Sequence, residues 1–175
     1  MSNRIDTTRL QEIARAYTAS AVLYAALDVG LFTQVSGGCR TEEALVDATG
    51  LRPIDVDRLV SCTLSLGLLD WDGAELCNAP DVEAYLVEGK ERYAGPWMMF
   101  TRPDVMGWFQ MTEKMRDPDS TKLGMYDDLT VESARKYHQA TSSIGFGAAR
   151  RFVRTVDLSN RTHLLDLGGG SGAYS

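Results

Sequence analysis

The sequence predicts a mainly helical N-terminal region that contains a winged helix, followed by the first strand and the glycine loop of an α/β domain. Two patterns lead to this prediction. Residues 41–80 indicate a helix, a turn, a second helix and a β-hairpin, which is the element order of a winged helix. Near the other end of the sequence, the apolar run LLDL leads directly into GGGSG, a pattern typical of a buried strand that turns tightly beside a ligand.

The first helix is predicted to begin at Thr8, which forms a capping box with Gln11, and to end at Gly30. Apolar residues recur at helical spacing from Leu10 onward, and residues 19–27 (ASAVLYAAL) are apolar on nearly every side. A helix of this kind has to be covered all round. We therefore expect it to pack against its own core and against a partner chain.

Two further helices and a hairpin are predicted next. Thr41 is expected to cap a short helix that ends at Gly50, and a second helix is expected over residues 53–67, opened by its proline. The dipeptide Asp72-Gly73 lies between two short extended runs and predicts a hairpin turn. The buried face of the second helix is expected to consist of Val56, Leu59, Val60 and Leu64.

The charge of this predicted winged helix argues against DNA binding. Residues 41–80 contain eight acidic and two basic side chains, and the whole chain has a net charge of −6. Duplex binding needs several contacts from Lys or Arg to phosphates. We therefore expect no nucleic-acid partner, and we interpret the winged helix as a scaffold or a dimerisation element.

The composition also bears on the compartment. No apolar run is long enough to span a membrane, and the N-terminal MSNRIDTTRL lacks the apolar core of a signal peptide. The three cysteines, Cys39, Cys62 and Cys77, lack the spacing of metal ligands and are expected to be reduced. These features predict a cytoplasmic protein with no metal and no membrane contact.

After Pro80 the chain is predicted to be helical again, with Pro103 bending or interrupting a longer helix. Pro118 and Gly124 indicate a loop. Thr130 is then expected to cap a long helix that runs to about residue 156, before a strand over residues 163–167.

Two ligand-binding templates fit the glycine loop. G-x-G-x-x-A over Gly168, Gly170 and Ala173 is similar to the dinucleotide fingerprint, and D-x-G-x-G-x-G, which adds Asp166 and Gly172, matches the first motif of class I S-adenosyl-L-methionine-dependent methyltransferases. In both templates the glycines let the backbone turn tightly and approach the ligand. Asp166 favours the second, because a carboxylate is unfavourable beside a pyrophosphate but is tolerated by a cofactor with an ammonium and a sulfonium group. A glycine-rich turn without a ligand stays open as an alternative.

Together, these regions resemble the plant-type and bacterial antibiotic-tailoring O-methyltransferases, the caffeic acid O-methyltransferase-like family. The resemblance lies in ARAYTASAVLYAALDVGLFTQV, in TEEALVDATGLRPIDVDRLVSCTLSLGLLDWD and in LLDLGGGSG. It spans nearly the whole chain but only the N-terminal half of the family's fold. It implies a homodimer with interleaved N-terminal helices. It also implies S-adenosyl-L-methionine as the cofactor and metal-independent methyl transfer to a hydroxyl of an aromatic or polyketide-like small molecule.

The resemblance also implies the residues of the site. The cofactor contacts fall on Asp166, Gly168, Gly169, Gly170 and Gly172. The acceptor contacts fall on Met98, Met99, Trp108, Tyr137 and Thr141, of which the first three fit plain core packing equally well. The family's ribose-binding acid and general-base histidine fall beyond residue 175, and neither His138 nor His163 matches the base position. No catalytic residue is therefore expected within these 175 residues.

The expected division is a dimerisation and winged-helix domain over residues 1–100, a helical connector lining the acceptor pocket over 101–160, and the start of a Rossmann-like domain over 161–175. Three explanations for the end of the sequence stay open: a fragment, a split enzyme completed by a second polypeptide, or a degenerate homologue kept for dimerisation or regulation. The glycine motif does not report the fate of the methyl group. A cofactor-binding hydroxylase, decarboxylase or pericyclase is therefore an alternative, as is a non-catalytic dimeric adaptor.

Overall fold

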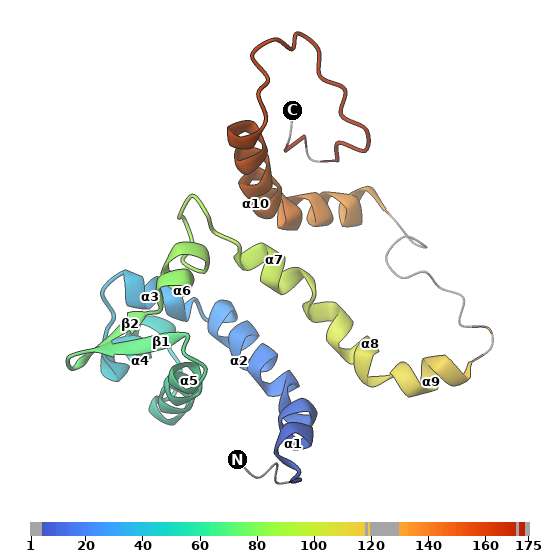
Figure 1. Cartoon of the computed structure of the whole chain (residues 1–175). Helices are drawn as coiled ribbons and strands as arrows, with labels where there is room; N and C mark the ends of the chain where they lie inside the picture. Colours follow the sequence, from blue (N-terminus) through green and yellow to red (C-terminus); the bar gives the residue numbers. More distant parts are fainter. Residues whose placement is uncertain (1–4, 118, 120–129, 171, 174–175) are drawn as a thin grey trace. The chain divides into compact units, whose positions relative to one another are not determined.

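The structure is a computed structural model that describes residues 5–117, 119, 130–170 and 172–173 (Figure 1). The chain divides into two compact units, Met1–Lys90 and Glu91–Ser175. The domain boundaries predicted at residues 100 and 160 stay predictions. The loop predicted around Pro118 and Gly124 lies outside the described residues.

The first unit combines short helices with one antiparallel hairpin (Figure 1). Its elements are α1 (Thr8–Arg15), α2 (Tyr17–Asp28), α3 (Leu31–Ser36), α4 (Glu42–Thr49), α5 (Pro53–Ser65), β1 (Leu69–Asp72), β2 (Glu75–Asn78) and α6 (Pro80–Tyr85). In the hairpin, Leu69 lies opposite Asn78 and Asp72 lies opposite Glu75. Strand β1 contacts α5, and β2 contacts α3 and α6. The predicted order of helix, helix and hairpin is therefore present, and its assignment as a winged helix used for dimerisation stays a prediction.

The core of the first unit is apolar and closely packed. Its side chains, each at most 2% exposed, are Ala26, Leu31, Phe32, Val35, Leu45, Val56, Val60, Leu69, Leu76 and Val82. On α5, Val56 and Val60 are buried as predicted, whereas Leu59 and Leu64 are half-buried. The buried residue that the apolar pattern missed is Thr63, whose hydroxyl lies 2.9 Å from the carbonyl oxygens of Leu59 and Val60. A hydroxyl satisfied within its own helix can be buried at little cost.

The start of the first helix differs from the prediction. The N-cap is Thr7 and not Thr8, because the carboxylate of Asp6 accepts a hydrogen bond from the backbone N–H of Thr8 at 2.9 Å. That backbone bond, together with a contact to the Thr8 side chain, lowers the pKa of Asp6. The Gln11 side chain donates to the hydroxyl of Thr7, at 2.8 Å. The predicted single helix is also divided at Ala16, between α1 and α2.

The caps predicted further along are confirmed, with one shift in the hairpin. The Thr41 hydroxyl accepts the N–H of Ala44 at 3.2 Å, and α4 ends at Gly50, whose φ is 69°. The hairpin turn lies one residue later than predicted, over Gly73 and Ala74, because Asp72 still pairs in the ladder. Gly73 has a φ of 65°, and no described residue other than glycine has a positive φ. Glycine in the first loop position is the pattern of a type II′ turn.

The second unit contains α7 (Gly95–Phe100), the 3₁₀ helix η1 (Arg102–Asp104), α8 (Val105–Phe109), α9 (Met111–Arg116) and α10 (Val131–Thr155). Pro103 lies in η1, so the predicted interruption is confirmed. A capping box begins α10: the Thr130 hydroxyl accepts the N–H of Ser133 at 3.1 Å, and the Ser133 hydroxyl accepts the N–H of Thr130 at 2.8 Å. The prediction that Thr130 caps a helix ending near residue 156 is confirmed. Among the described residues, no helix is long and apolar enough to cross a lipid bilayer.

The strand predicted over residues 163–167 is not formed in the structure, and the prediction was wrong on this point. These residues have an irregular backbone, and the side chains of Leu164, Leu165 and Leu167 are 62–84% exposed. A strand requires a neighbour for its backbone N–H and C=O groups. Within the described residues, the strand ladder is the β1–β2 hairpin of the other unit. Among the described residues, the apolar run therefore has no partner strand of the kind that its pattern requires.

A carboxylate ties three elements of the first unit together. Glu83 on α6 accepts hydrogen bonds from the Ser36 hydroxyl at 2.7 Å and from the Asn78 amide at 2.6 Å, and it also binds the ammonium of Lys90. Burial raises the pKa of Glu83, but these hydrogen bonds and the Lys90 charge outweigh it and lower the pKa to about 2. The ionised carboxylate therefore stabilises the folded state.

The stability of the chain is expected to fall as the pH falls from about 4.5 to about 2. Glu83 has its lowered pKa only in the folded state, so the unfolded state takes up its proton first. Because the Glu83 side chain is 37% exposed, we expect a loss of about 1–2 kcal/mol, less than the full pKa difference implies. Urea unfolding across this pH range measures it. The Glu83→Gln variant should lose this part of the pH dependence, and the Glu88→Gln variant should keep it. Equal pH dependence in all three proteins would contradict this role of Glu83.

Candidate functional site

The glycine loop has a backbone that only glycine adopts readily. Gly168, Gly170 and Gly172 have φ values of 74°, 56° and 71°, in the left-handed region that L side chains rarely occupy. At Gly169, an added Cβ would lie 2.7 Å from a carboxylate oxygen of Asp166. The N–H of Gly172 donates to the carbonyl of Gly169 at 2.8 Å and closes the turn. Each predicted glycine is thus required by the loop's own conformation or by a close approach within it.

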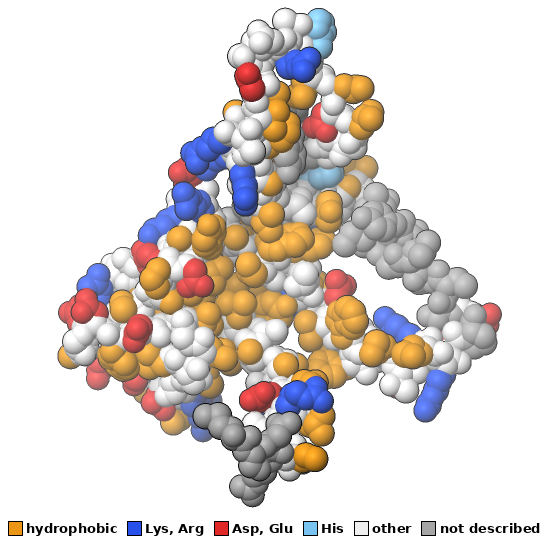
Figure 2. Space-filling view, in the orientation of Figure 1, with side chains coloured by type: hydrophobic (Ala, Val, Ile, Leu, Met, Phe, Trp, Pro, Cys, Tyr) orange, Lys and Arg blue, Asp and Glu red, His pale blue; other side chains and the backbone are white. Residues whose placement is uncertain are grey.

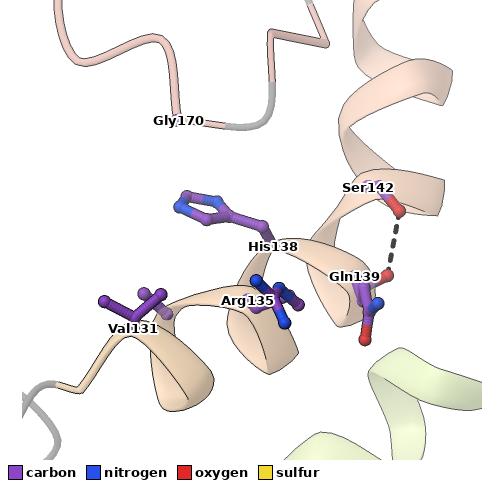
Figure 3. Close-up of a pocket in the computed structure, with 7 residues that line it drawn as sticks. Val131, Arg135, His138, Gln139, Ser142 and Gly170 are labelled. Atoms are coloured by element: carbon purple, nitrogen blue, oxygen red, sulfur yellow. Dashed lines mark hydrogen bonds between the residues drawn. The ribbon is translucent and has the colours of Figure 1, made fainter.

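A pocket of about 510 Å³ lies between this loop and the first turns of α10 (Figure 3). It is lined by Val131, Ala134, Arg135, His138, Gln139, Ser142 and Gly170. The imidazole of His138 projects from α10 toward Gly170 (Figure 3), and a Cβ added at Gly170 would lie 3.2 Å from Cε1 of His138. The pocket therefore combines the glycine loop with one face of a helix.

Aromatic side chains hold α10 against α7. The rings of Trp97 and Phe100 stack with centroids 5.9 Å apart, and Phe100 meets Tyr137 edge-on at 5.4 Å. Tyr137 in turn meets the His138 ring edge-on at 5.6 Å. This row fixes the position of His138, because each ring is packed against the next.

The predicted acceptor residues lie outside the lining of this pocket. Tyr137 is half-buried in the aromatic row, and the Thr141 hydroxyl donates to the Tyr137 carbonyl at 2.9 Å. Met98 and Met99 are half-buried on α7. Trp108 is 71% exposed on α8, where apolar side chains gather at the surface (Figure 2). Their role as acceptor contacts stays a prediction.

Of the predicted cofactor residues, Gly170 lines the pocket and the others shape the loop beside it. The Asp166 carboxylate lies over Gly169, within the loop itself. Among the described residues, no cluster of His, Cys, Asp or Glu is arranged to hold a metal ion. The glycine loop thus forms one side of the pocket, and the first turns of α10 form the opposite wall.

The predicted site residues do not include the polar side chains of that wall. Arg135, His138, Gln139 and Ser142 recur at intervals of three or four residues, which places them along one side of a helix. This spacing was visible in the sequence. The resemblance gives no indication of it, because His138 does not match the family's general-base position.

Comparisons with known proteins address the resemblance directly. No protein-family model matches the chain. The chain is 28% identical over 173 residues to 3-hydroxy-5-methyl-1-naphthoate 3-O-methyltransferase of Streptomyces sahachiroi, which covers 95% of this chain and 50% of that protein. It is 24% identical to the tetracenomycin polyketide synthesis 8-O-methyl transferase TcmO of Streptomyces glaucescens, over 92% of this chain and 49% of that protein. The predicted resemblance to the O-methyltransferase family is confirmed.

The similarity to the O-methyltransferase family is partial in length. The chain spans about half the length of the curated relatives it matches. One further relative differs in its named reaction: the N,N-dimethyltransferase OxyT of Streptomyces rimosus is 24% identical over 93% of this chain and 50% of that protein. The family's members that resemble this chain therefore include an enzyme named for nitrogen methylation as well as enzymes named for oxygen methylation.

Solved structures show the same fold. Human N-acetylserotonin methyltransferase in complex with SAM has a TM-score of 0.76 at 20% identity, covering 99% of this chain and 56% of that chain. An O-methyltransferase family protein from Burkholderia thailandensis has a TM-score of 0.71 at 22% identity, covering 98% and 52%. CalO1, a methyltransferase of calicheamicin biosynthesis in its SAH-bound form, has a TM-score of 0.72 at 20% identity, covering 98% and 55%. The chain thus has the fold found in about half of each of these methyltransferases.

Proposed function

We propose that this chain forms the N-terminal half of an S-adenosyl-L-methionine-dependent O-methyltransferase that modifies an aromatic or polyketide-like small molecule in secondary metabolism. One observation supports this most: the alignments with the naphthoate and tetracenomycin O-methyltransferases cover more than 90% of the chain. The glycine loop with left-handed φ values lies in the same chain and supports the cofactor assignment.

The loop residues fit the amino-acid end of such a cofactor. Gly168 and Gly170 lack the side chains that would cover their backbone, so a ligand can approach their N–H groups directly, whereas the N–H of Gly172 closes the turn. The Asp166 carboxylate lies over the loop and offers a negative charge to an ammonium group. When bound, the cofactor supplies an electrophilic methyl group on a sulfonium. The chain's own contribution is to hold that end of the molecule and to keep it facing the wall of α10.

The acceptor is proposed to lie along α7, α8 and α10, where Met98, Met99, Trp108, Tyr137 and Thr141 were predicted. Methyl transfer requires alignment of the acceptor oxygen, the methyl carbon and sulfur, and removal of a proton from the hydroxyl. The aromatic row contributes to alignment by fixing α10 against α7. The ribose-binding acid and the base are proposed to come from the second half of the fold, either in one polypeptide or from a second one.

A product measurement tests this function. The protein with both halves of the fold, given S-adenosylmethionine and a hydroxynaphthoate, is expected to yield a product heavier by one methyl group in mass spectrometry. Cofactor binding with a product that lacks the methyl mass would contradict methyl transfer and favour other chemistry on the same fold.

Nitrogen methylation is the second candidate, because OxyT is named as an N,N-dimethyltransferase. The same assay distinguishes the two reactions when the acceptor is replaced by its amino analogue. Methylation of the amine with no product from the hydroxyl compound would favour this second candidate.

The N-terminal helices are proposed to form a homodimer interface. Helix α1 has no buried residue, and Leu10, Ile13 and Tyr17 are each more than half exposed. Their spacing of three and four residues places them on one side of the helical segment. Large apolar side chains gathered in this way favour coverage by another chain.

The double variant Leu10→Glu/Ile13→Glu is expected to convert a dimer into a monomer, because it places two charges in an apolar interface. Light scattering coupled to size exclusion measures the mass. Val153→Glu is the control, since Val153 is 60% exposed on α10, outside the N-terminal helices and the predicted winged helix. A wild-type monomer, or a double variant that stays dimeric, would contradict the proposed interface.

A further inference from the structure

We propose that Tyr93 is a positioning residue for the acceptor side of the site. Its ring lies on Gly95, where any other residue would carry a side chain, and so sets the position at which α7 begins. The proposal deepens the proposed function and rests on it for the identity of the acceptor. Tyr93 acts through α7, which carries Met98 and Met99.

The contact between Tyr93 and Gly95 leaves no room for a side chain. A Cβ added at Gly95 would lie 2.6 Å from Cε2 of the Tyr93 ring, and closer still to its Cζ and hydroxyl oxygen. Gly95 is buried, and Tyr93 is half-buried. Non-bonded carbon atoms pack at about 3.5–4.0 Å, so the ring and a side chain cannot occupy this space together.

The backbone of Gly95 does not itself require glycine. Gly95 is the first residue of α7 and is not among the described glycines with a positive φ. An alanine would therefore adopt this backbone conformation without strain. In this respect Gly95 differs from Gly168 and Gly170, whose left-handed φ values favour glycine. The neighbouring ring is thus the reason for glycine at this position.

The position of α7 depends on contacts at its ends, because the helix is short. It has six residues, and the N–H groups of Trp97 and Met98 both donate to the carbonyl of Ala94, at 3.0 and 3.2 Å. At the other end, Phe100 meets Tyr137 of α10 with ring centroids 5.4 Å apart (Figure 1). A helix of this length gains little stability from its own hydrogen bonds. The ring contact at its start and the aromatic contact at its end therefore fix where α7 lies.

An ion pair also ties the segment before α7 to α10. A guanidinium nitrogen of Arg150 lies 2.7 Å from a carboxylate oxygen of Glu91, and the two side chains are 49% and 73% exposed. Ion pairs at this exposure contribute little, because water and salt screen them. An aromatic ring packed on a buried backbone contributes more. We therefore expect the Tyr93 ring, and not the ion pair, to position α7.

The cofactor side is expected to be independent of this contact. Among the described residues, those that line the pocket beside the glycine loop belong to α10 and to the loop, and none of them lies on α7. The proposed acceptor residues Met98 and Met99 follow Gly95 by three and four residues on the same short helix. A shift of α7 should therefore alter acceptor binding and leave cofactor affinity unchanged.

Steady-state kinetics on the protein with both halves of the fold, with S-adenosylmethionine and a hydroxynaphthoate, test the positioning role. Gly95→Ala is expected to raise the KM for the acceptor about tenfold, because it displaces the ring or the helix. Cofactor affinity, measured by calorimetry with S-adenosylhomocysteine, should change less than about twofold. Gly147→Ala is the matched control, since a Cβ there would meet nothing within 4 Å, and it should leave both values unchanged.

A double-variant cycle shows whether the ring causes the effect. Tyr93→Ala is expected to raise the acceptor KM about tenfold. Adding Gly95→Ala to it should change the KM less than about twofold further, because the space is then free. Tyr93→Phe keeps the ring and should stay within about threefold of the wild type. Losses that add in the double variant, or equal changes in acceptor KM and cofactor affinity, would overturn the positioning role.

Urea unfolding of the same variants tests the contact without activity. Gly95→Ala should lower the unfolding midpoint in the wild-type background and lower it less in the Tyr93→Ala background. A protein that shows this coupling but transfers no methyl group would keep the contact and lose the proposed function. A protein that methylates its acceptor with an unchanged KM in Gly95→Ala would keep the function and lose the positioning role.

Discussion

Replacing Gly170 with valine is expected to weaken cofactor binding about a hundredfold in the protein with both halves of the fold. Gly170 has a φ of 56°, a conformation that is strongly unfavourable for a β-branched residue. Its Cβ would also lie 3.2 Å from Cε1 of His138, before the two valine methyl groups are added. The loop would have to rearrange, and the backbone groups proposed to hold the cofactor would move. Isothermal calorimetry with S-adenosylhomocysteine measures the change.

Gly147→Val is the matched control for this variant. Gly147 lies in α10, and an added Cβ there would meet nothing within 4 Å. Its backbone is helical, so valine introduces no left-handed strain. Cofactor affinity should stay within about twofold of the wild type. Equal losses in the two variants would show that any larger side chain in this unit disturbs binding, and the assigned role of Gly170 would then be wrong.

Replacing Phe32 with alanine is expected to lower the free energy of unfolding by about 3–5 kcal/mol. Among the described residues, Phe32 is the largest fully buried side chain, and it is 1% exposed in the core of the first unit. Truncation removes its apolar contacts and leaves a cavity that neighbouring side chains fill only in part. Urea unfolding followed by far-ultraviolet circular dichroism measures the loss.

Ile54→Ala serves as the control, because Ile54 is 48% exposed on α5. Its loss should be below about 1 kcal/mol, since most of the removed surface already faces water. If Phe32→Ala cost no more than Ile54→Ala, the packing described for the first unit would be incorrect.

Much of the first unit could be predicted because its signals are local. Thr41 caps α4, Gly50 ends it and Pro53 opens α5, and each of these depends on a few neighbouring residues. Where two local acceptors compete, the prediction shifted: Asp6 binds the N–H of Thr8 and moves the cap by one residue. The hairpin turn also lies one residue later than predicted, for a different reason: glycine suits either position of a two-residue loop.

The second unit was harder to predict because its structure depends on residues far apart in the sequence. The run at 163–167 has the composition of a buried strand, but strand formation requires a partner strand, which its own sequence does not report. The pocket brings Gly170 to His138, across more than thirty residues. The glycine motif therefore indicated the loop, while the structure showed that the polar side of α10 lies opposite it.

Calorimetric titration of the protein with both halves of the fold by S-adenosylmethionine tests whether the glycine loop holds the amino-acid end of this cofactor. We expect saturable binding with one site per chain, weakened about a hundredfold in Gly170→Val and kept in Gly147→Val. Absence of saturable binding in a folded protein would contradict this role of the loop.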